Sequence, residues 1–461
     1  FKKLRGMFAF AIWDNVKKKL ILYRDLYGIK PLYFFYSRDY FCFSSSLKTL
    51  LKFPYIKKNY DQNAILSFNL TGSVPEPMTI IQDIKIIEPG TLFEIDLKTH
   101  KIKKKRLESI LKIYSLNKKT ESKSLKECLD ETIKAHLVAD VQTGLFLSSG
   151  IDSTLISKII KPKTLKAFTI SFNNFKDTQN DEIKLSKKFC KDEKINLTVK
   201  YYNNEEILKI LPNFFDKMEQ PTVDGLNNFL VCKLLRKKKI KIALSGTGAD
   251  EILCGYNTFL RAKIIFCLLF IFPKYFIKLS SHIFKFLMMR KIYKTLNFIS
   301  SKQIFDIYFF LRSNKEYFYK AEFQNIKKIS SLVSRNLGNY KLLNFNEKIS
   351  YFELMLYQKN QLLRDLDWTG MSNSIEMRVP FIDKIFLKQI KSNEILAKIP
   401  KKRIIKKYLN LLPDYILNRK KTGFSVPYNE ILEKFNLKYN KSYTRWSELS
   451  LNEYLKTMEK I

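Results

Sequence analysis

The sequence has few of the residues that build metal centres or disulfide frameworks. Its 461 residues include three histidines and six cysteines, and no two cysteines are spaced as Cys-x-x-Cys. Zinc sites need clusters of these residues, so we expect no zinc site. The cysteines are scattered through apolar segments, which is typical of reduced thiols. We therefore expect a cytoplasmic protein.

Long hydrophobic runs are also lacking. The longest, Ile264–Phe272, has nine residues and is followed by Pro273, whereas a transmembrane helix needs about 20. We expect this run to form a core helix, with contact to a membrane surface as the alternative. No signal peptide is visible. Because the chain starts at Phe1 and a strand-like segment follows at once, we expect a fragment that lacks its N-terminal part.

Acidic residues are scarce relative to basic ones. The sequence has 44 Asp and Glu against 83 Lys and Arg, which gives a formal charge of +39. One interpretation is a surface for nucleic acid or an acidic membrane. The other is a compositional bias, because most of the basic residues are lysines spread along the whole chain. We favour the bias and expect neither nucleic acid nor a membrane as partner, although positive potential would favour ATP and acidic substrates.

The sequence does contain enough apolar material for two or three packed domains. Apolar residues make up 46% and aromatic residues 14%, far more than in a disordered chain. Early in the chain, short runs such as Phe8–Trp13 and Leu20–Arg24 predict antiparallel strands. Further along, strands alternate with helices, which is typical of a doubly wound parallel sheet. We predict a mixed α/β and α+β protein with a mostly antiparallel, sandwich-like domain at residues 1–115, a parallel-sheet domain at 120–461 and a helical insertion at about 256–345.

A strand, a loop of small residues and a helix start follow one another at Leu145–Thr154. Thr143–Leu147 predicts a buried strand and Ser148–Gly150 a tight turn. Asp152 and Ser153 then begin a helical pattern. Backbone N–H groups and the helix dipole make such a loop an anion site. The spacing differs from that of a Walker loop and resembles the pyrophosphate-binding loop of ATP pyrophosphatases, which cleave ATP between its α and β phosphates. The alternative is an ordinary serine-rich turn.

A second strand, a glycine-bearing loop and an acidic helix start occur at Ala243–Glu251. In a doubly wound sheet, loops at the carboxyl ends of strands border one crevice, so we expect this loop to face the first one. Ser245 and Gly246 would approach the nucleotide. Asp250 and Glu251 are suited to hold Mg²⁺, which prefers carboxylate and phosphate oxygens. The alternative is that both acids only stabilise the start of a helix.

Two further segments carry clustered charges. In Asp367–Asp383, charged and apolar residues alternate around Pro380, which predicts buried ion pairs. An ion-pair scaffold at a helix end is the favoured interpretation. The basic turn Arg419–Phe424 would suit a phosphate or a developing oxyanion, although a solvated surface is favoured for such a turn alone. The candidates for a substrate pocket in the first segment are Asp367, Glu376, Arg378 and Asp383.

In this order, the four segments resemble the glutamine-hydrolysing asparagine synthetases. That family joins a class II glutamine amidotransferase domain to an ATP-pyrophosphatase-type synthetase domain. In the N-terminal part the resemblance rests on Arg5–Asp14, Arg24–Tyr33 and Glu88–Gly90. In the synthetase part the resemblance rests on the four segments described above and on Gln220–Asn227. Residues 256–345 contribute little to it.

The resemblance implies ATP-dependent synthesis of an amide. The side-chain carboxylate of aspartate would attack the α-phosphorus of ATP, giving β-aspartyl-AMP and pyrophosphate. Ammonia, taken from glutamine in the intact protein, would then displace AMP to form asparagine. The partners would be small molecules, with a homodimer as a candidate assembly, and Mg²⁺ would be the cofactor. The residues implied to bind ATP are Phe146, Leu147, Ser148, Ser149, Gly150, Asp152, Ser153, Ile170, Ser245 and Gly246. The implied metal ligands are Asp152, Asp250 and Glu251, and the implied catalytic positions are Lys421 and Thr247.

Three departures from the family pattern bear on this expectation. Thr247 stands where the best-known members have a glutamate, so the alternative acceptor is a different carboxylate, such as a sugar acid or a peptide. Ser149 replaces a glycine of the usual loop. The N-terminal nucleophilic cysteine is absent, and Cys42, inside a strand pattern, is expected to pack in the core. We therefore expect no glutamine hydrolysis from this stretch of chain. The alternative from another class, a basic RNA-binding protein, lacks an RNA-reading module.

Overall fold

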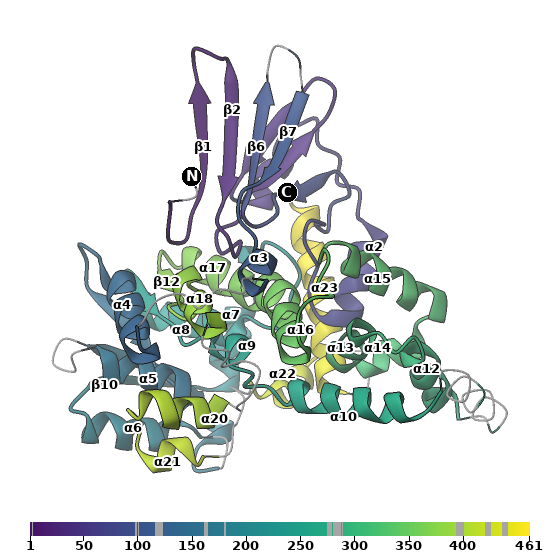
Figure 1. Ribbon diagram of the computed structural model, residues 1–461. Helices are drawn as coiled ribbons and strands as arrows, with labels where there is room; N and C mark the ends of the chain where they lie inside the picture. The colour runs from purple at the N-terminus through teal and green to yellow at the C-terminus, as the bar shows by residue number, and fades with distance from the viewer. Residues whose placement is uncertain are drawn as a thin grey trace.

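The computed structural model has an antiparallel β region at one end and a larger α/β region below it (Figure 1). The C-terminal helix α23 (Ser442–Glu459) runs upward between the two (Figure 1). The structure describes residues 1, 3–96, 99, 101–115, 123–160, 165–178, 181–273, 279, 287, 289–392, 401–419, 426–435 and 441–461.

The antiparallel region contains two sheets with the strand orders β1-β2-β6-β7 and β4-β3-β5. Every pairing in both is antiparallel. Leu22, Ile87 and Phe93 form part of a buried apolar cluster in this region. This confirms the antiparallel architecture predicted for the N-terminal part. The elements are β1 (Ala9–Asp14), β2 (Lys19–Arg24), β3 (Tyr33–Tyr36), β4 (Phe41–Ser44), α1 (Leu47–Leu51), α2 (Gln62–Thr71), β5 (Ile84–Ile86), β6 (Thr91–Asp96), β7 (Lys101–Arg106) and α3 (Ile110–Tyr114).

The α/β region is built on a five-stranded sheet with the order β10-β9-β8-β11-β12, in which every pairing is parallel. This confirms the doubly wound sheet. β12 was not predicted, because its three residues carry two charges. The elements are α4 (Leu125–Leu137), β8 (Thr143–Phe146), α5 (Ile151–Ile159), β9 (Lys166–Phe172), a 3₁₀ turn (Asn173–Phe175), α6 (Ile183–Asp192), β10 (Asn196–Tyr202), α7 (Asn204–Lys217), α8 (Leu226–Lys237), β11 (Ile242–Leu244), α9 (Ala249–Ile252), α16 (Phe345–Phe352), the π-helix η3 (Glu353–Leu363), α17 (Arg364–Met371), β12 (Glu376–Arg378), α18 (Lys384–Ser392), α20 (Lys401–Ile404), η4 (Ile405–Leu409), α21 (Asp414–Leu417) and α22 (Tyr428–Leu432).

A helical layer separates β11 from η3 along the chain. It comprises α10 (Asn257–Ile271), α12 (Arg290–Ile299), α13 (Ile304–Arg312), α14 (Lys315–Lys320) and α15 (Phe323–Arg335). The prediction that Ile264–Phe272 forms a core helix is wrong in one respect. The run is helical, but Ile264, Leu268, Phe270 and Ile271 are exposed, and only one face of α10 packs against the protein.

A buried ion cluster fastens the two regions together. Glu76, in the antiparallel region, accepts hydrogen bonds from Arg24 Nη1 and Nη2 at 2.9 and 3.1 Å. Lys359 and Arg364 approach the same carboxylate from η3 and α17, with N–O distances of 3.6 and 3.7 Å. Burial acts to raise the pKa of Glu76, but the three cations outweigh it and hold the pKa below its usual value. The carboxylate is therefore ionised and binds both regions.

Candidate active site

The first loop is closed by its own serine hydroxyls. Ser153 Oγ donates to the Ser148 carbonyl at 2.9 Å, and the Ser148 backbone N–H donates back to Ser153 Oγ at 3.1 Å. Gly150 is the N-cap of α5 and its N–H donates to Ser148 Oγ at 3.1 Å. The loop thus holds its shape at the positive end of the α5 dipole, as an anion site requires.

The strands on either side keep this loop at the carboxyl edge of the sheet. The Leu147 N–H donates to the Phe168 carbonyl of β9 at 2.9 Å. Ile170 lies further along β9 and is buried. Phe146 is the last residue of β8 and is half-buried. Phe146, Leu147 and Ile170, three of the predicted nucleotide contacts, therefore lie on or next to the strands that precede and flank the loop.

The second loop lies against the first. A methyl group added at Gly246 would come within 2.8 Å of Asp152 Cβ and 2.9 Å of the Ser153 nitrogen. The backbone at Gly246 therefore approaches closer than any residue with a side chain allows. Gly248 is the N-cap of α9 with φ +100°, a conformation that favours glycine. The Ser245 N–H donates to the Arg378 carbonyl at 2.8 Å, which anchors this loop to β12.

A lysine joins the two loops. Lys401 Nζ donates to Asp152 Oδ2 at 2.6 Å and to Asp250 Oδ1 at 2.5 Å. Burial acts to lower the pKa of Lys401, but the two carboxylates outweigh it, and the pKa lies above its usual value. The sequence did not single out Lys401, because it stands in the run Lys401-Lys402-Arg403 and nothing in that run marks one cation as buried.

The two aspartates offer a donor set that suits Mg²⁺. Their carboxylates converge on one cation, and Mg²⁺ is commonly held by one or two carboxylates together with substrate phosphates. Among the residues that the structure describes, no group of three or more His, Cys, Asp or Glu side chains surrounds one point. A metal at this position would therefore depend on phosphate and water oxygens for its remaining ligands.

Glu251 is not brought to this pair of aspartates. Its side chain is buried, and Oε1 accepts a hydrogen bond from the Tyr256 hydroxyl at 2.8 Å. Burial and the nearby charge of Asp250 raise the pKa of Glu251 to about 8. At neutral pH this carboxyl is therefore largely protonated, which makes it a poor ligand for Mg²⁺.

Thr247 contacts its own loop. Its hydroxyl lies 2.8 Å from Ser245 Oγ, and its N–H donates to the same oxygen at 3.3 Å. The side chain is short and uncharged. This position therefore contributes a hydroxyl, whereas a glutamate here would contribute a longer side chain with a carboxylate.

Arg419 brings the basic turn to the first loop. Its guanidinium donates to Ser149 Oγ and, through Nη2, to Glu182 Oε1 at 3.1 Å. One member of the basic turn thus contacts the predicted phosphate loop. Lys421, the predicted catalytic cation, lies outside the described residues.

The four charged residues predicted as candidates for a substrate pocket all form ion pairs. Asp367 pairs with Lys30 at 2.8 Å and Asp383 with Arg5 at 2.8 Å, so both contact the antiparallel region. Glu376 and Arg378 pair with each other, and Arg378 also donates to the carbonyls of His136 and Val138 at the C-terminal end of α4. The structure therefore places Asp367, Glu376, Arg378 and Asp383 in ion pairs that support the fold, as the favoured interpretation of this segment predicts.

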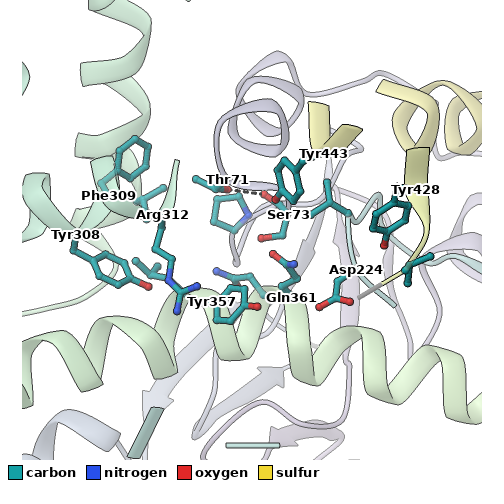
Figure 2. Close-up of a pocket in the computed structure, with 16 residues that line it drawn as sticks. Thr71, Ser73, Asp224, Tyr308, Phe309, Arg312, Tyr357, Gln361, Tyr428 and Tyr443 are labelled. Carbon is teal, nitrogen blue, oxygen red and sulfur yellow. Dashed lines mark hydrogen bonds between the residues drawn. The ribbon is translucent and has the colours of Figure 1, made fainter. Parts of the chain in front are cut away.

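A cavity of about 450 Å³ lies among α2, α13, η3 and the C-terminal part of the chain (Figure 2). Figure 2 shows Arg312 and Asp224 on opposite sides of it, with Tyr357 and Gln361 between them. Arg312 also pairs with the buried Glu353 at 2.6 Å. The cavity is lined by Thr71, Ser73, Pro75, Val223, Asp224, Tyr308, Phe309, Arg312, Val333, Leu356, Tyr357, Asn360, Gln361, Val426, Tyr428 and Tyr443.

The cavity wall is linked to the acidic start of α9. The Arg312 guanidinium lies 4.7 Å from the centre of the Tyr256 ring, and the hydroxyl of that tyrosine donates to Glu251. The guanidinium also lies 4.0 Å from the Tyr357 ring. Sequence reasoning missed this cavity because its residues come from segments more than 300 positions apart and share no local pattern.

A parallel α/β sheet with two facing small-residue loops, joined to an antiparallel β region, is the arrangement of a nucleotide-binding domain with a second domain attached. The chain matches the asparagine synthase family over residues 124–455 and the glutamine amidotransferase domain over residues 1–106. It is 29% identical over 453 residues to asparagine synthetase (glutamine-hydrolyzing) 1 of Bacillus subtilis, covering 92% of this chain and 68% of that protein. A putative asparagine synthetase of Mycobacterium bovis is 25% identical over 459 residues, with the same coverage. A putative asparagine synthetase of Methanocaldococcus jannaschii is 30% identical over 271 residues, 56% of this chain and 51% of that protein.

The chain therefore belongs to the asparagine synthase family. It is a ligase that uses ATP to form an amide, and it carries a glutamine amidotransferase domain at its N-terminal end.

Proposed function

We propose that this enzyme converts aspartate to asparagine through an acyl-adenylate, with glutamine as the source of ammonia in the intact protein. The aspartate carboxylate attacks the α-phosphorus of ATP, which forms β-aspartyl-AMP and releases pyrophosphate. Ammonia then attacks the acyl carbon, which forms asparagine and releases AMP. The observation that carries the proposal is the convergence of Asp152 and Asp250 on one cation between two phosphate-type loops.

The residues of the two loops account for the first step. The Ser148–Ser153 loop, at the positive end of α5, holds the pyrophosphate portion of ATP. Lys401 and Arg419 place two cations beside this loop. Both can stabilise negative charge as it develops on the departing pyrophosphate, because fixed cations in a water-poor site act without reorganisation.

Asp152 and Asp250 would hold Mg²⁺, because both offer the carboxylate oxygens that this ion prefers. When bound there, the metal would neutralise phosphate charge and polarise the phosphoryl oxygens. The two aspartates would orient it, whereas the carboxyl of Glu251 accepts a hydrogen bond from Tyr256.

The names of the relatives support aspartate as acceptor and glutamine as nitrogen donor, since each is called a glutamine-hydrolysing asparagine synthetase. The test is release of pyrophosphate from ATP and Mg²⁺ in the presence of aspartate and ammonium chloride. We expect release that depends on aspartate and yields asparagine and AMP in equal amounts. Absence of aspartate-dependent release from folded protein would refute the proposal.

A second candidate keeps the chemistry and changes the acceptor to a larger carboxylate, such as a sugar acid or a peptide. Two observations favour it. Thr247, in the second loop, carries a hydroxyl and not a carboxylate. The cavity lined by Asp224 and Arg312 has the volume of pockets that hold drug-sized ligands. A screen of sugar acids and peptides for AMP formation distinguishes the two acceptors. AMP formation with one of them and not with aspartate would favour the second candidate.

A further inference from the structure

Helix α10 presents an apolar face to the outside of the molecule. Leu260, Ile264, Leu268 and Ile271 are exposed and recur at the spacing of one helical face, and Phe270, at 76% exposed, stands beside them. The opposite face packs inward through Phe259, Ala262 and Leu269. In Figure 1, α10 lies along the lower edge of the protein, on the side away from the antiparallel sheets.

The apolar surface continues beyond the end of α10. Phe272 is exposed, and so are Met289 and Ile292 at the beginning of α12, which lies near the C-terminal end of α10 in Figure 1. Exposed apolar patches of this extent mark contact sites for proteins or membranes rather than ordinary surface.

Basic side chains border this surface. Arg261, Lys263, Arg290 and Lys291 are exposed on the same two helices. No Asp or Glu occurs anywhere in residues 252–305 of the sequence. A partner must therefore be apolar at the centre of the contact and negatively charged around it, which describes a bilayer with anionic lipids.

The same charges disfavour a second copy of this chain as the partner. Two identical faces would bring their basic residues together without any acid to pair them, and like charges at close range cost free energy. A second copy could avoid this repulsion between basic residues only by binding through a surface other than its own α10 face.

The helix is suited to lie on a bilayer and not to cross it. The segment Ala249–Ile271 is long and apolar enough to span a membrane by length and composition, and 28% of its apolar window is buried. Its first residues, however, are held in the active site, where Asp250 binds Lys401. The 15 residues of α10 itself reach about 22 Å, which is shorter than a hydrocarbon core of about 30 Å.

We propose that α10 and the beginning of α12 form a membrane-binding surface, with the α10 axis parallel to the plane of a bilayer that contains anionic lipid. The exposed apolar side chains enter the acyl boundary and the basic side chains contact lipid phosphates. The sequence-based expectation of no membrane partner rests on a compositional bias toward lysine and on an apolar run too short to span a bilayer, and neither observation bears on an exposed helix face.

The experiment is flotation of the protein with vesicles of phosphatidylcholine alone or of an equal mixture of phosphatidylcholine and phosphatidylglycerol. We expect binding to the mixed vesicles and weak binding to phosphatidylcholine. The test variant combines Leu260→Glu, Leu268→Glu and Phe270→Glu. The control combines Val16→Glu, Val138→Glu and Leu342→Glu, which are exposed apolar residues elsewhere and receive the same added charge.

The test variant should bind the mixed vesicles about tenfold or more weakly, because three buried apolar side chains are lost. The control should bind like the wild type, and both variants should keep the wild-type melting temperature and AMP formation. Equal loss in both variants would show that bulk charge alone is responsible and would overturn the proposal. Absence of wild-type flotation, together with self-association that the test variant abolishes, would overturn it in favour of a second copy.

Discussion

In the part of the chain that the structure describes, two buried ion clusters differ in composition and in use. At the junction of the two regions, one carboxylate, Glu76, lies among three cations. At the two loops, two carboxylates, Asp152 and Asp250, share one cation, Lys401. The first cluster has excess positive charge around a single acid, and the second has excess negative charge around a single base.

The surroundings of the cations separate the clusters further. All five N–H donors of Arg24 are satisfied by protein acceptors, namely Glu76 and the carbonyls of Gly28, Lys30 and Ile87. Lys401 instead donates to two carboxylates on facing loops, and a divalent cation attracts both more strongly than an ammonium does. A cluster whose donors are all satisfied by protein acceptors holds a fold together. A cluster in which one lysine bridges two carboxylates can instead bind a ligand cation.

The largest expected effect is on catalysis. Asp250→Asn removes one of the two charges at the loops, and we expect aspartate-dependent pyrophosphate release to fall by about 10²–10³-fold, the range for losing a preorganised electrostatic contact. The thermal unfolding midpoint should change little, because Lys401 keeps its bond to Asp152. Steady-state kinetics at saturating Mg²⁺ measures this.

The matched control for that variant is Asp177→Asn, the same chemical change at an exposed aspartate with φ +63°, a conformation that asparagine accepts. It should retain full activity. If Asp250→Asn were as active as this control, the loop cluster would be structural like the one at Glu76.

The next effect is on stability. Glu76→Gln leaves Arg24, Lys359 and Arg364 buried without their counter-ion, and breaking a buried ion cluster in this way costs about 3–5 kcal/mol. We expect the free energy of unfolding in urea to fall by this amount, while the molecules that remain folded keep their activity. A stable variant with lost activity would reverse the roles assigned to the two clusters.

The loop cluster was partly predictable from the sequence and the junction cluster was not. Asp152 and Asp250 each follow a strand and a small-residue loop, so local pattern and sheet order place them near each other. Lys401 comes from the far end of the chain and stands among other lysines, so only the folded structure shows its position. The same holds for Glu76, whose cations lie about 50 and 280 positions away in the sequence.

The errors of sequence reasoning have physical causes. The run Ile264–Phe272 is as apolar as a core helix, and a sequence cannot show that only one face of a helix is covered. Glu251 is adjacent to Asp250, but successive residues on a helix point in different directions, and its carboxyl contacts Tyr256 while Asp250 contacts Lys401. For the charged residues around Pro380 the favoured ion-pair interpretation is confirmed, but the sequence could not show that the partners Lys30 and Arg5 belong to the other region.

A smaller effect tests how closely the two loops must approach. Gly246→Ala places a methyl group 2.8 Å from Asp152 Cβ, so the loops must separate by a few tenths of an ångström. We expect the KM for ATP to rise by about tenfold, roughly 1.4 kcal/mol, with little change in stability. Unchanged ATP affinity would show that the loops can shift without affecting the nucleotide, and the loop cluster would then be less rigid than the junction.

A last effect, which shows only as a pH dependence, concerns a buried carboxylate that belongs to neither cluster. Asp365 accepts hydrogen bonds from the Thr222 hydroxyl at 2.6 Å and from Trp368 Nε1 at 2.9 Å. Burial and the nearby Asp224 raise its pKa to about 8 from a usual 3.8. Between these two values the folded state keeps a proton that the unfolded state has lost, so this group makes the protein less stable as pH rises from about 4 to about 8.

Asp365→Asn removes this dependence. The stability of the variant relative to wild type should increase with pH across that window by at most about 1.4 kcal/mol per pH unit, which corresponds to one proton. Urea unfolding at several pH values measures the slope, and the slope is independent of any constant loss from the altered hydrogen bonds. A parallel pH dependence in both proteins would mean that Asp365 is ionised in the fold. A buried carboxylate would then be tolerated here without a hydrogen-bonded cation, contrary to the arrangement in both ion clusters.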